Sequence, residues 1–144
     1  LAKQLAYYVV LYSPMQMASD LVENYETHPA FKFIENVPVD WEKTHVLNGQ
    51  IGDFITMARK DRNGSNWYLG SITDENARKL NISLDFLEKG QTYNTVIYQD
   101  GENAHWKENP TDYEIHTQKF TSEDQLSLKL APGGGAAVEF KLVK

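Results

Sequence analysis

The spacing of the apolar side chains changes near residue 42, and this change constrains the fold more than any other feature of the sequence. Beyond that point, apolar and polar residues alternate with the period of two that is typical of half-buried β-strands. Before it, apolar residues such as Leu1, Leu5 and Tyr8 recur at helical spacing. The sequence therefore predicts a helical segment over residues 1–42 and a β-domain over residues 43–144.

The β-domain is predicted to be an antiparallel β-sandwich or barrel. It contains about eight runs rich in β-branched and aromatic residues, separated by turn-forming residues and by no helices. THVLNGQIGDFITMARK predicts a hairpin that turns at Asn48-Gly49, and a second Asn-Gly pair stands at Asn63-Gly64. The predicted core consists of Phe54, Trp67, Leu69, Leu80, Ile82, Leu84, Tyr93, Val96, Tyr98, Leu126, Leu128, Leu130, Val138 and Phe140.

The first 42 residues predict a helix, a short strand and a second helix. The opening helix is apolar on most sides, as is typical of a helix buried from several directions, and Pro14 ends or kinks it. MQMA (Met15–Ala18) is compatible with a short strand, and a helix is expected near Pro29–Val37 with Thr27 as its N-cap. Trp41 is expected to pack between this segment and the β-domain. Two helices cannot cover so much apolar surface, so we expect further polypeptide to do so.

Composition excludes several kinds of partner. The net charge is −6 without a basic cluster, which argues against nucleic acid and against docking on anionic membranes. The apolar stretch from Leu5 is too short and too polar to cross a bilayer, because Ser13, Pro14 and Gln16 interrupt it. Without cysteine, the chain has no disulfide framework, no thiolate zinc site and no cysteine nucleophile.

The residues by themselves indicate no catalytic or metal site. LAPGGGAAVEF continues as a strand, so its glycines predict a tight connection rather than a phosphate loop. Asp100, Glu102 and Asp112 offer oxygen ligands for calcium, but their spacing does not match an EF-hand. His105-Trp106 is expected to anchor that loop. The carboxylate pairs are sequence neighbours, which does not show the facing arrangement that glycoside hydrolysis needs.

Four successive blocks carry a family resemblance that covers essentially the whole chain. They are LAYYVVLYSPMQMASDLVENYE, FKFIENVPVDWEKTHVLNGQIGDFITMARK, NWYLGSITDENARKLNISLDFLEKGQTYNTVIYQDG and LKLAPGGGAAVEF. Together they resemble the C-terminal end of glycoside hydrolase family 97, the α-glucosidases and α-galactosidases typical of Bacteroidetes. The resemblance implies that this chain is the C-terminal fragment of a larger periplasmic or secreted hydrolase of α-linked oligosaccharides.

Members of that family have an N-terminal β-supersandwich, a catalytic (β/α)8 barrel and a C-terminal β-sandwich. By resemblance, residues 1–42 are the last helix–strand–helix segment of the barrel and residues 43–144 are the C-terminal sandwich. The supersandwich and the rest of the barrel are then the missing partners within the same polypeptide. The opening helix would be buried by that barrel.

The family's chemistry uses glutamate residues and a calcium ion, with an aspartate nucleophile in the retaining members. The resemblance places these groups upstream of Leu1, so it assigns no catalytic residue, cofactor or metal ligand to this chain, which is expected to be inactive alone. Active sites of barrels lie at the C-terminal ends of the strands, which places Gln16, Ser19 and Asp20 near the rim of the substrate pocket. Alternatively, Asp20 caps the following turn and Gln16 packs in the barrel.

Three functions remain for the sandwich. The favoured one is a structural domain that packs on the barrel and supports self-association. A carbohydrate-binding module is the alternative, and it predicts that aromatic residues such as Tyr93, Tyr98 or Trp106 are exposed on one face. The third function is a freestanding binding protein. It would need a natural start near Leu1, and the uncapped apolar helix there argues against such a start.

Overall fold

Eight strands build the β-domain of the molecule, whose computed structural model describes residues 1–143. They are β1 (Trp41–Gln50), β2 (Phe54–Asp61), β3 (Trp67–Thr73), β4 (Arg78–Ser83), β5 (Tyr93–Asp100), β6 (Tyr113–Phe120), β7 (Gln125–Leu130) and β8 (Gly135–Leu142). The expected number of strands is confirmed, and the first strand begins at Trp41.

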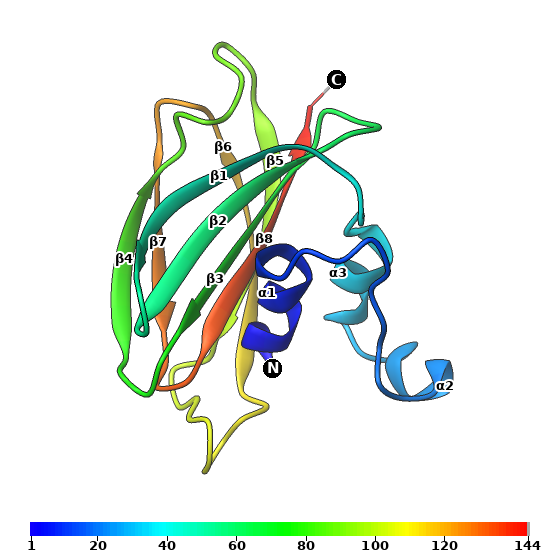
Figure 1. Cartoon of the computed structure of the whole chain (residues 1–144), viewed down its shortest axis with the longest axis vertical. Coiled ribbons are helices and arrows are strands. Elements are labelled where there is room, and N and C mark those ends of the chain that lie inside the picture. Colours follow the sequence, from blue (N-terminus) through cyan, green and yellow to red (C-terminus); the bar gives the residue numbers. More distant parts are fainter. Residues whose placement is uncertain (144) are drawn as a thin grey trace.

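The strands form two antiparallel sheets that face each other (Figure 1). The larger sheet has six strands in the order β1-β2-β3-β8-β5-β6, and β4 pairs with β7 in the smaller one. Three helices, α1 (Ala2–Val10), α2 (Val22–Tyr25) and α3 (Phe31–Asn36), lie on the other side of the six-stranded sheet. The predicted fold class, a mainly β antiparallel sandwich, is confirmed. The segment before it, predicted as a short α/β piece from the end of a (β/α)8 barrel, has helices but no strand among the described residues.

The main core lies between the two sheets. β4 and β7 alternate buried and exposed side chains, so they present one apolar face to the larger sheet. Two predicted core residues are corrected: Val96 and Tyr98 lie on the opposite face of β5, under the helices. Phe54 is only partly buried. The other predicted residues are in this core: Trp67, Leu69, Leu80, Ile82, Leu84, Tyr93, Leu126, Leu128, Leu130, Val138 and Phe140.

The Asn-Gly pairs mark hairpins, but neither forms a type I′ turn. Asn48 and Gly49 lie within β1, where they pair with Thr56 and Ile55. The chain turns three residues later, over Gln50–Asp53, where Gly52 has a φ of 89° that a side chain would strain. In the second hairpin neither residue of Asn63-Gly64 has a positive φ.

The N-terminal segment differs from its prediction in one element. α1 ends at Val10, before Pro14, and α3 lies within the predicted range but starts after Ala30, so Thr27 is not its N-cap. No strand forms at Met15–Ala18 in the described chain. A strand needs a hydrogen-bonding neighbour, and residues 1–143 supply none to this stretch.

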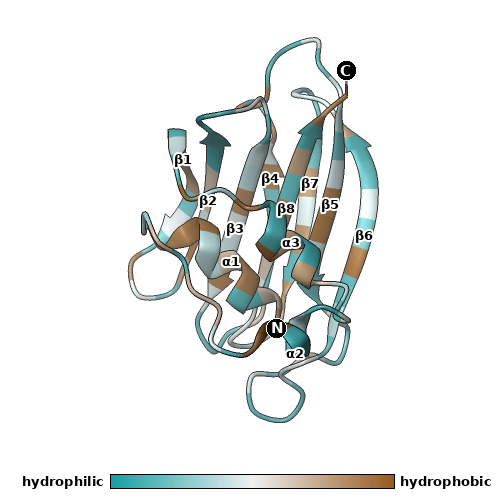
Figure 2. Ribbon diagram, turned by 90° about the vertical axis from the view of Figure 1, so that its right-hand side faces the viewer, coloured by the Kyte–Doolittle hydropathy of each residue, from teal (hydrophilic) through white to brown (hydrophobic). Residues whose placement is uncertain are grey.

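The six-stranded sheet covers one face of α1, and burial of the rest of this helix by a barrel stays a prediction. Ala2, Leu5, Ala6 and Val9 are buried, and Figure 2 shows α1 and α3 in front of the sheet. An uncovered apolar surface lies in the segment that comes after α1 in the chain. It consists of Leu11, Tyr12, Met15, Met17, Leu21 and Val22, each more than half exposed. None of the helices in residues 1–143 is long and apolar enough to cross a membrane.

Small residues on β3 and β8 let α1 approach the sheet closely. Gly70 pairs with Ala137 across these strands, and Ile72 pairs with Gly135. A Cβ atom at Gly70 would lie 2.7 Å from the backbone oxygen of Ala6, and one at Gly135 would lie 2.9 Å from the Cα of Lys3. Only glycine fits at these two contacts without displacing the helix.

We expect Gly70→Ala to lower the free energy of unfolding by about 1–3 kcal/mol, because the added methyl group would overpack against helix backbone. Gly49→Ala is the control, since a Cβ there would lie no closer than 3.3 Å to another atom. Urea denaturation of both variants measures the difference. Equal stability of the two variants would contradict the close contact.

Candidate functional site

The interface between the helices and the six-stranded sheet is the candidate functional site, because it joins the first 40 residues to the β-domain. Its buried residues, which we call the helix–sheet interface, are Leu5, Val9, Ala30, Phe33, Trp41, Tyr68, Tyr98 and Ala137. Phe33 of α3 makes edge contacts with Tyr68 and Tyr98, at centroid distances of 6.1 and 5.4 Å. Trp41 contacts Tyr68 at 5.8 Å, so its predicted place between the two parts is confirmed.

A buried carboxylate on β8 ties the end of α3 to the sheet. Glu139 is 1 % exposed, and its Oε2 accepts a hydrogen bond from the Asn36 amide at 3.1 Å. The Tyr68 hydroxyl lies 3.1 Å from Glu139 Oε1 and 2.9 Å from the backbone oxygen of Asn36. Lys141 Nζ lies 3.2 Å from Glu139 Oε1 and supplies a cation. The buried charge is therefore both paired and hydrogen-bonded.

Burial and the neighbouring Glu139 carboxylate raise the pKa of Tyr68. Burial, again with Glu139 nearby, raises the pKa of Tyr98 to about 12. Both hydroxyls therefore keep their protons at ordinary pH, and Tyr68 acts as a hydrogen-bond donor rather than as a base. The arrangement is suited to fixing α3 and not to transferring a proton.

Arg59 of β2 lies at the C-terminal end of α1. Its guanidinium lies 5.8 Å from the ring centroids of both Tyr12 and Trp41, and Nη2 is 3.5 Å from the backbone oxygen of Val10. A cation is favourable at the end of a helix and over aromatic faces. Burial lowers the pKa of Arg59. The Arg59 side chain therefore holds the C-terminal end of α1 against the sheet.

The predicted rim residues lie together after α1, but they have different surroundings. Gln16 and Ser19 line a cavity of about 370 Å³ between α1 and α3, and the Gln16 amide donates to the backbone oxygen of Leu11 at 3.1 Å. Asp20 accepts hydrogen bonds from the Leu21 N–H and the Asn24 amide, which lower its pKa. A position of these residues at the rim of a substrate pocket stays a prediction.

The predicted glycine-rich connection joins β7 to β8, and Gly133 alone of its three glycines has a positive φ, of 68°. Asp100 closes this connection, since its Oδ2 accepts the N–H groups of Ala131 and Gly135 at 2.9 and 2.7 Å. Burial raises the pKa of Asp100, although the two N–H groups act in the opposite direction. A Cβ at Gly134 would collide with this carboxylate. The role of Asp100 is thus structural, because it fixes the connection between β7 and β8.

The described residues do not fit a calcium site. Among residues 1–143, no three His, Asp or Glu side chains gather in a way that could hold a metal ion. Asp100 is occupied by backbone N–H groups, and Asp112 accepts the N–H of Asn103 at 3.0 Å. The calcium ion that the family resemblance implies for the intact enzyme stays a prediction.

The aromatic residues named for sugar binding do not form an exposed surface. Tyr93 and Tyr98 are buried, which removes two of the three candidates. The Trp106 side chain is 57 % exposed and stacks beside His105 at 5.9 Å, and the backbone N–H of Trp106 donates to the Pro132 backbone oxygen. It anchors its loop over Gly133, as predicted, and leaves one isolated aromatic side chain at the surface.

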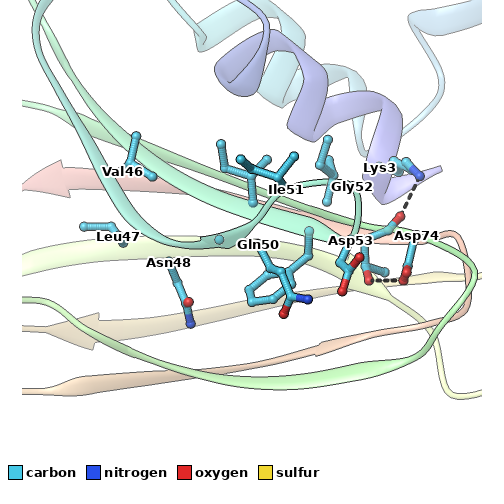
Figure 3. A pocket seen from close by; sticks show the side chains of 14 residues that line it. Lys3, Val46, Leu47, Asn48, Gln50, Ile51, Gly52, Asp53 and Asp74 are labelled. Carbon is cyan, nitrogen blue, oxygen red and sulfur yellow. Dashed lines mark hydrogen bonds between the residues drawn. The ribbon is translucent and has the colours of Figure 1, made fainter.

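A large hollow lies beside the β1–β2 turn. This hairpin groove has a volume of about 870 Å³ and is shown in Figure 3. It is lined by Lys3, Val46, Leu47, Asn48, Gly49, Gln50, Ile51, Gly52, Asp53, Phe54, Ile55, Ile72, Thr73 and Asp74. Ile51, at its tip, is fully exposed.

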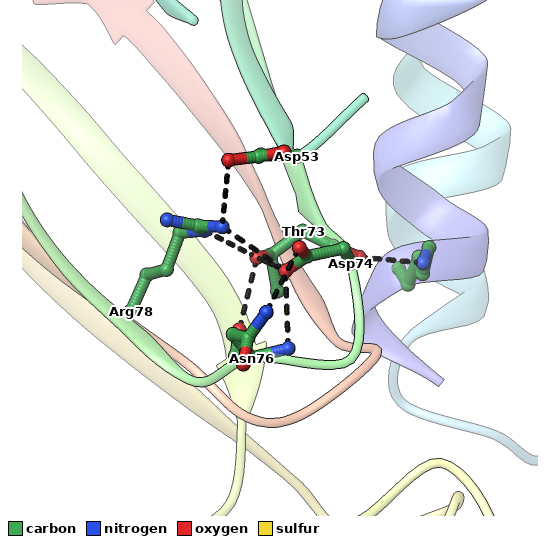
Figure 4. A network of polar contacts seen from close by, with 6 residues as sticks. Asp53, Thr73, Asp74, Asn76 and Arg78 are labelled. Carbon is green, nitrogen blue, oxygen red and sulfur yellow. Dashed lines mark hydrogen bonds and ion pairs between the residues drawn. The ribbon is translucent and has the colours of Figure 1, made fainter. Parts of the chain in front are cut away.

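A polar network at one end of the groove joins the two sheets (Figure 4). Arg78 of β4 donates to Thr73 Oγ1 at 2.9 Å and contacts Asp74 at 3.1 Å and Asp53 at 3.7 Å. The backbone N–H of Asn76, together with the Asn76 amide and Arg78, lowers the pKa of Asp74 to about 2. These charges are paired with one another, which is typical of a structural network rather than a catalytic one.

Four residues that hold the helices on the sheet were not expected from the sequence. They are Glu139, Gly70, Ala137 and Arg59. Glu139 had a detectable signal, because it is the single charged residue between small and apolar ones in GAAVEF. Gly70 and Ala137 had none, since a small residue in a strand does not reveal which element approaches it. Arg59 also looked like one of several ordinary charges in ITMARKDR.

Comparison with known proteins shows the same architecture in a set of larger enzymes. The family profile described as "Glycosyl-hydrolase 97 C-terminal, oligomerisation" matches residues 40–141. A retaining alpha-galactosidase of Bacteroides thetaiotaomicron is 38 % identical over 140 residues, which are 96 % of this chain and 20 % of that protein.

Solved structures agree with this result. A glycoside hydrolase family 97 enzyme from Pseudoalteromonas sp. strain K8, in complex with acarbose, is 53 % identical with a TM-score of 0.96, over 99 % of this chain and 22 % of that one. The family 97 enzyme of this strain was also solved with panose. A beta-arabinopyranosidase is 26 % identical with a TM-score of 0.75, over 96 % of this chain and 20 % of that one. The chain thus spans about a fifth of the length of these relatives.

We expect Glu139→Ala to destabilise the fold by about 1–3 kcal/mol, because it leaves the Asn36 amide and the Tyr68 hydroxyl with fewer buried partners. Tyr68→Phe, and the double variant with Glu139→Ala, complete a thermodynamic cycle measured by urea denaturation. The expected coupling is about 0.5–3 kcal/mol. Strict additivity of the two losses would contradict a shared hydrogen bond.

The Asp74 network predicts a specific dependence of stability on pH. The pKa of Asp74 is about 2 in the folded chain and about 3.9 in an unfolded one. Its stabilisation is therefore complete above about pH 5 and is lost as the pH falls toward 2. The stability difference between wild type and Asp74→Asn should shrink over that range. Asp85→Asn, at an exposed position, is the control, and a constant difference for Asp74→Asn would contradict the assignment.

Proposed function

The chain belongs to glycoside hydrolase family 97, and from this premise we propose that it is the non-catalytic C-terminal region of a hydrolase acting on α-glycosides. Its β-sandwich is the domain that the family description connects with oligomerisation. The proposal has two parts. The sandwich supports the last helices of a catalytic barrel, and it takes part in self-association of the whole enzyme.

The main evidence that the sandwich supports these helices is the close contact between the backbone of α1 and the sheet. At Gly70 and Gly135 the sheet lies so close to α1 that a Cβ atom would not fit between sheet and helix. Glu139 fixes α3 to the same sheet. These contacts attach α1 and α3 to the sandwich. If they are the last helices of the barrel, as the family resemblance implies, the sandwich and that side of the barrel form one rigid body.

The activity of the whole enzyme is proposed from its relatives. The 53 % identical enzyme was solved with acarbose, and the enzyme of the same strain with panose, which favours an α-glucoside substrate over an α-galactoside. The proposal includes a calcium ion bound by residues outside this chain and a periplasmic or secreted location. Gln16, Ser19 and Asp20 would lie near the rim of the substrate pocket.

The test compares the complete natural polypeptide with the 144-residue chain. The complete enzyme is expected to release nitrophenol from the nitrophenyl α-glucoside faster than from the α-galactoside. A calcium chelator should lower this rate, and added calcium should restore it. The 144-residue chain should release none. Hydrolysis by the short chain would contradict a non-catalytic role, and a faster reaction with the galactoside would contradict the substrate preference.

A further inference from the structure

The hairpin groove contains an apolar residue that the fold does not need. Gly52 is required in the β1–β2 turn by its positive φ, but its neighbour Ile51 contacts so little of the chain that its exposed fraction is 103 %. An exposed isoleucine at the tip of a turn gains nothing from folding, because its side chain stays in water. The side chain is therefore free to contact another surface.

The surface beside Ile51 is also apolar and is hollowed. Ile55 and Ile72 are cross-strand partners and therefore lie on one face of the sheet. Val46 lies on the same face, since it pairs with Met57, which in turn pairs with Gly70 under α1. Val46 is 61 % exposed, and the two isoleucines are half-buried. The groove thus offers an apolar receptor directly beside an apolar projection.

We infer that this hairpin groove is the surface through which two copies of the enzyme associate, with Ile51 of each copy inserted into the groove of the other. The inference rests on the self-association proposed above and assigns it a location. A projection and a receptor on one chain are self-complementary, which is the requirement of an isologous twofold interface. At the edge of the groove, Asp53 and Asp74 are paired with Arg78, and Lys3 Nζ donates to the backbone oxygen of Thr73 at 2.8 Å, so the charged groups there already have polar partners.

The other surfaces of the family-matched residues 40–141 fit such a contact less well. The outer face of the smaller sheet is polar, with Lys79, Asn81, Ser83, Gln125, Ser127 and Lys129 exposed. The exposed part of edge strand β6 is mostly polar or charged, and Trp106 is isolated.

Direct pairing of edge strand β1 with another β1 is also disfavoured. Its register against β2 shifts twice, between Trp41 and Lys43 and between Val46 and Asn48. Such irregularities twist an edge away from further strand addition. Association at this end of the sheet therefore depends on side chains at the tip of the hairpin rather than on backbone hydrogen bonds.

The experiment uses the complete natural polypeptide and measures its association by sedimentation velocity over a range of concentrations. Ile51→Asp should raise the dissociation constant of the dimer about 100-fold, because a central apolar anchor is lost twice. Ile115→Asp on β6 is the matched control and should leave the constant unchanged. Since Ile51 is fully exposed, its variant should melt at the wild-type temperature.

The outcomes separate this inference from the proposed function. A wild-type enzyme that is monomeric at all concentrations would overturn both. A wild-type dimer that Ile51→Asp leaves intact would overturn only the assigned surface. If that variant instead stays dimeric but melts at a lower temperature, the groove is covered by another part of the same polypeptide, which also overturns the inference.

Discussion

The close contact between α1 and the strands β3 and β8 is the constraint on which the rest of the structure depends. At Gly70 and Gly135 the helix backbone lies within reach of a Cβ atom, so the sheet must present glycine there. This contact fixes the distance between the helical layer and the sheet. It also decides that β8, in the centre of the sheet, is buried on both faces.

Polar side chains then determine how the helical layer is oriented. Apolar contact alone would allow α3 to slide, because hydrophobic burial has no direction. Glu139 and Tyr68 remove that freedom, since their hydrogen bonds to Asn36 need particular atoms at particular distances. Arg59 does the same at the end of α1. Such directional contacts fix the position of the helical layer on the sheet.

Much of the fold could be predicted from the sequence, but the position of turns and the choice of face could not. The period of two identified the strands and most of the core. Asn48-Gly49 misled the turn prediction because Gly52, three residues later, satisfies the need for a positive φ equally well. Val96 and Tyr98 were assigned to the wrong face because both sides of β5 are apolar, and periodicity cannot then say which side meets the second sheet.

The sequence by itself determined the class of fold, the division near residue 42 and the family, because these depend on local patterns and on blocks of residues that can be read in order. Only the tertiary structure decided what the small and charged residues do. Gly70 and Ile51 are ordinary in sequence, Glu139 is marked only by its apolar neighbours, and each gains its role from where it lies. Gly70 and Glu139 meet elements distant along the chain, while Ile51 meets none. Contacts between distant segments arise from the packing of whole layers, which no local pattern encodes.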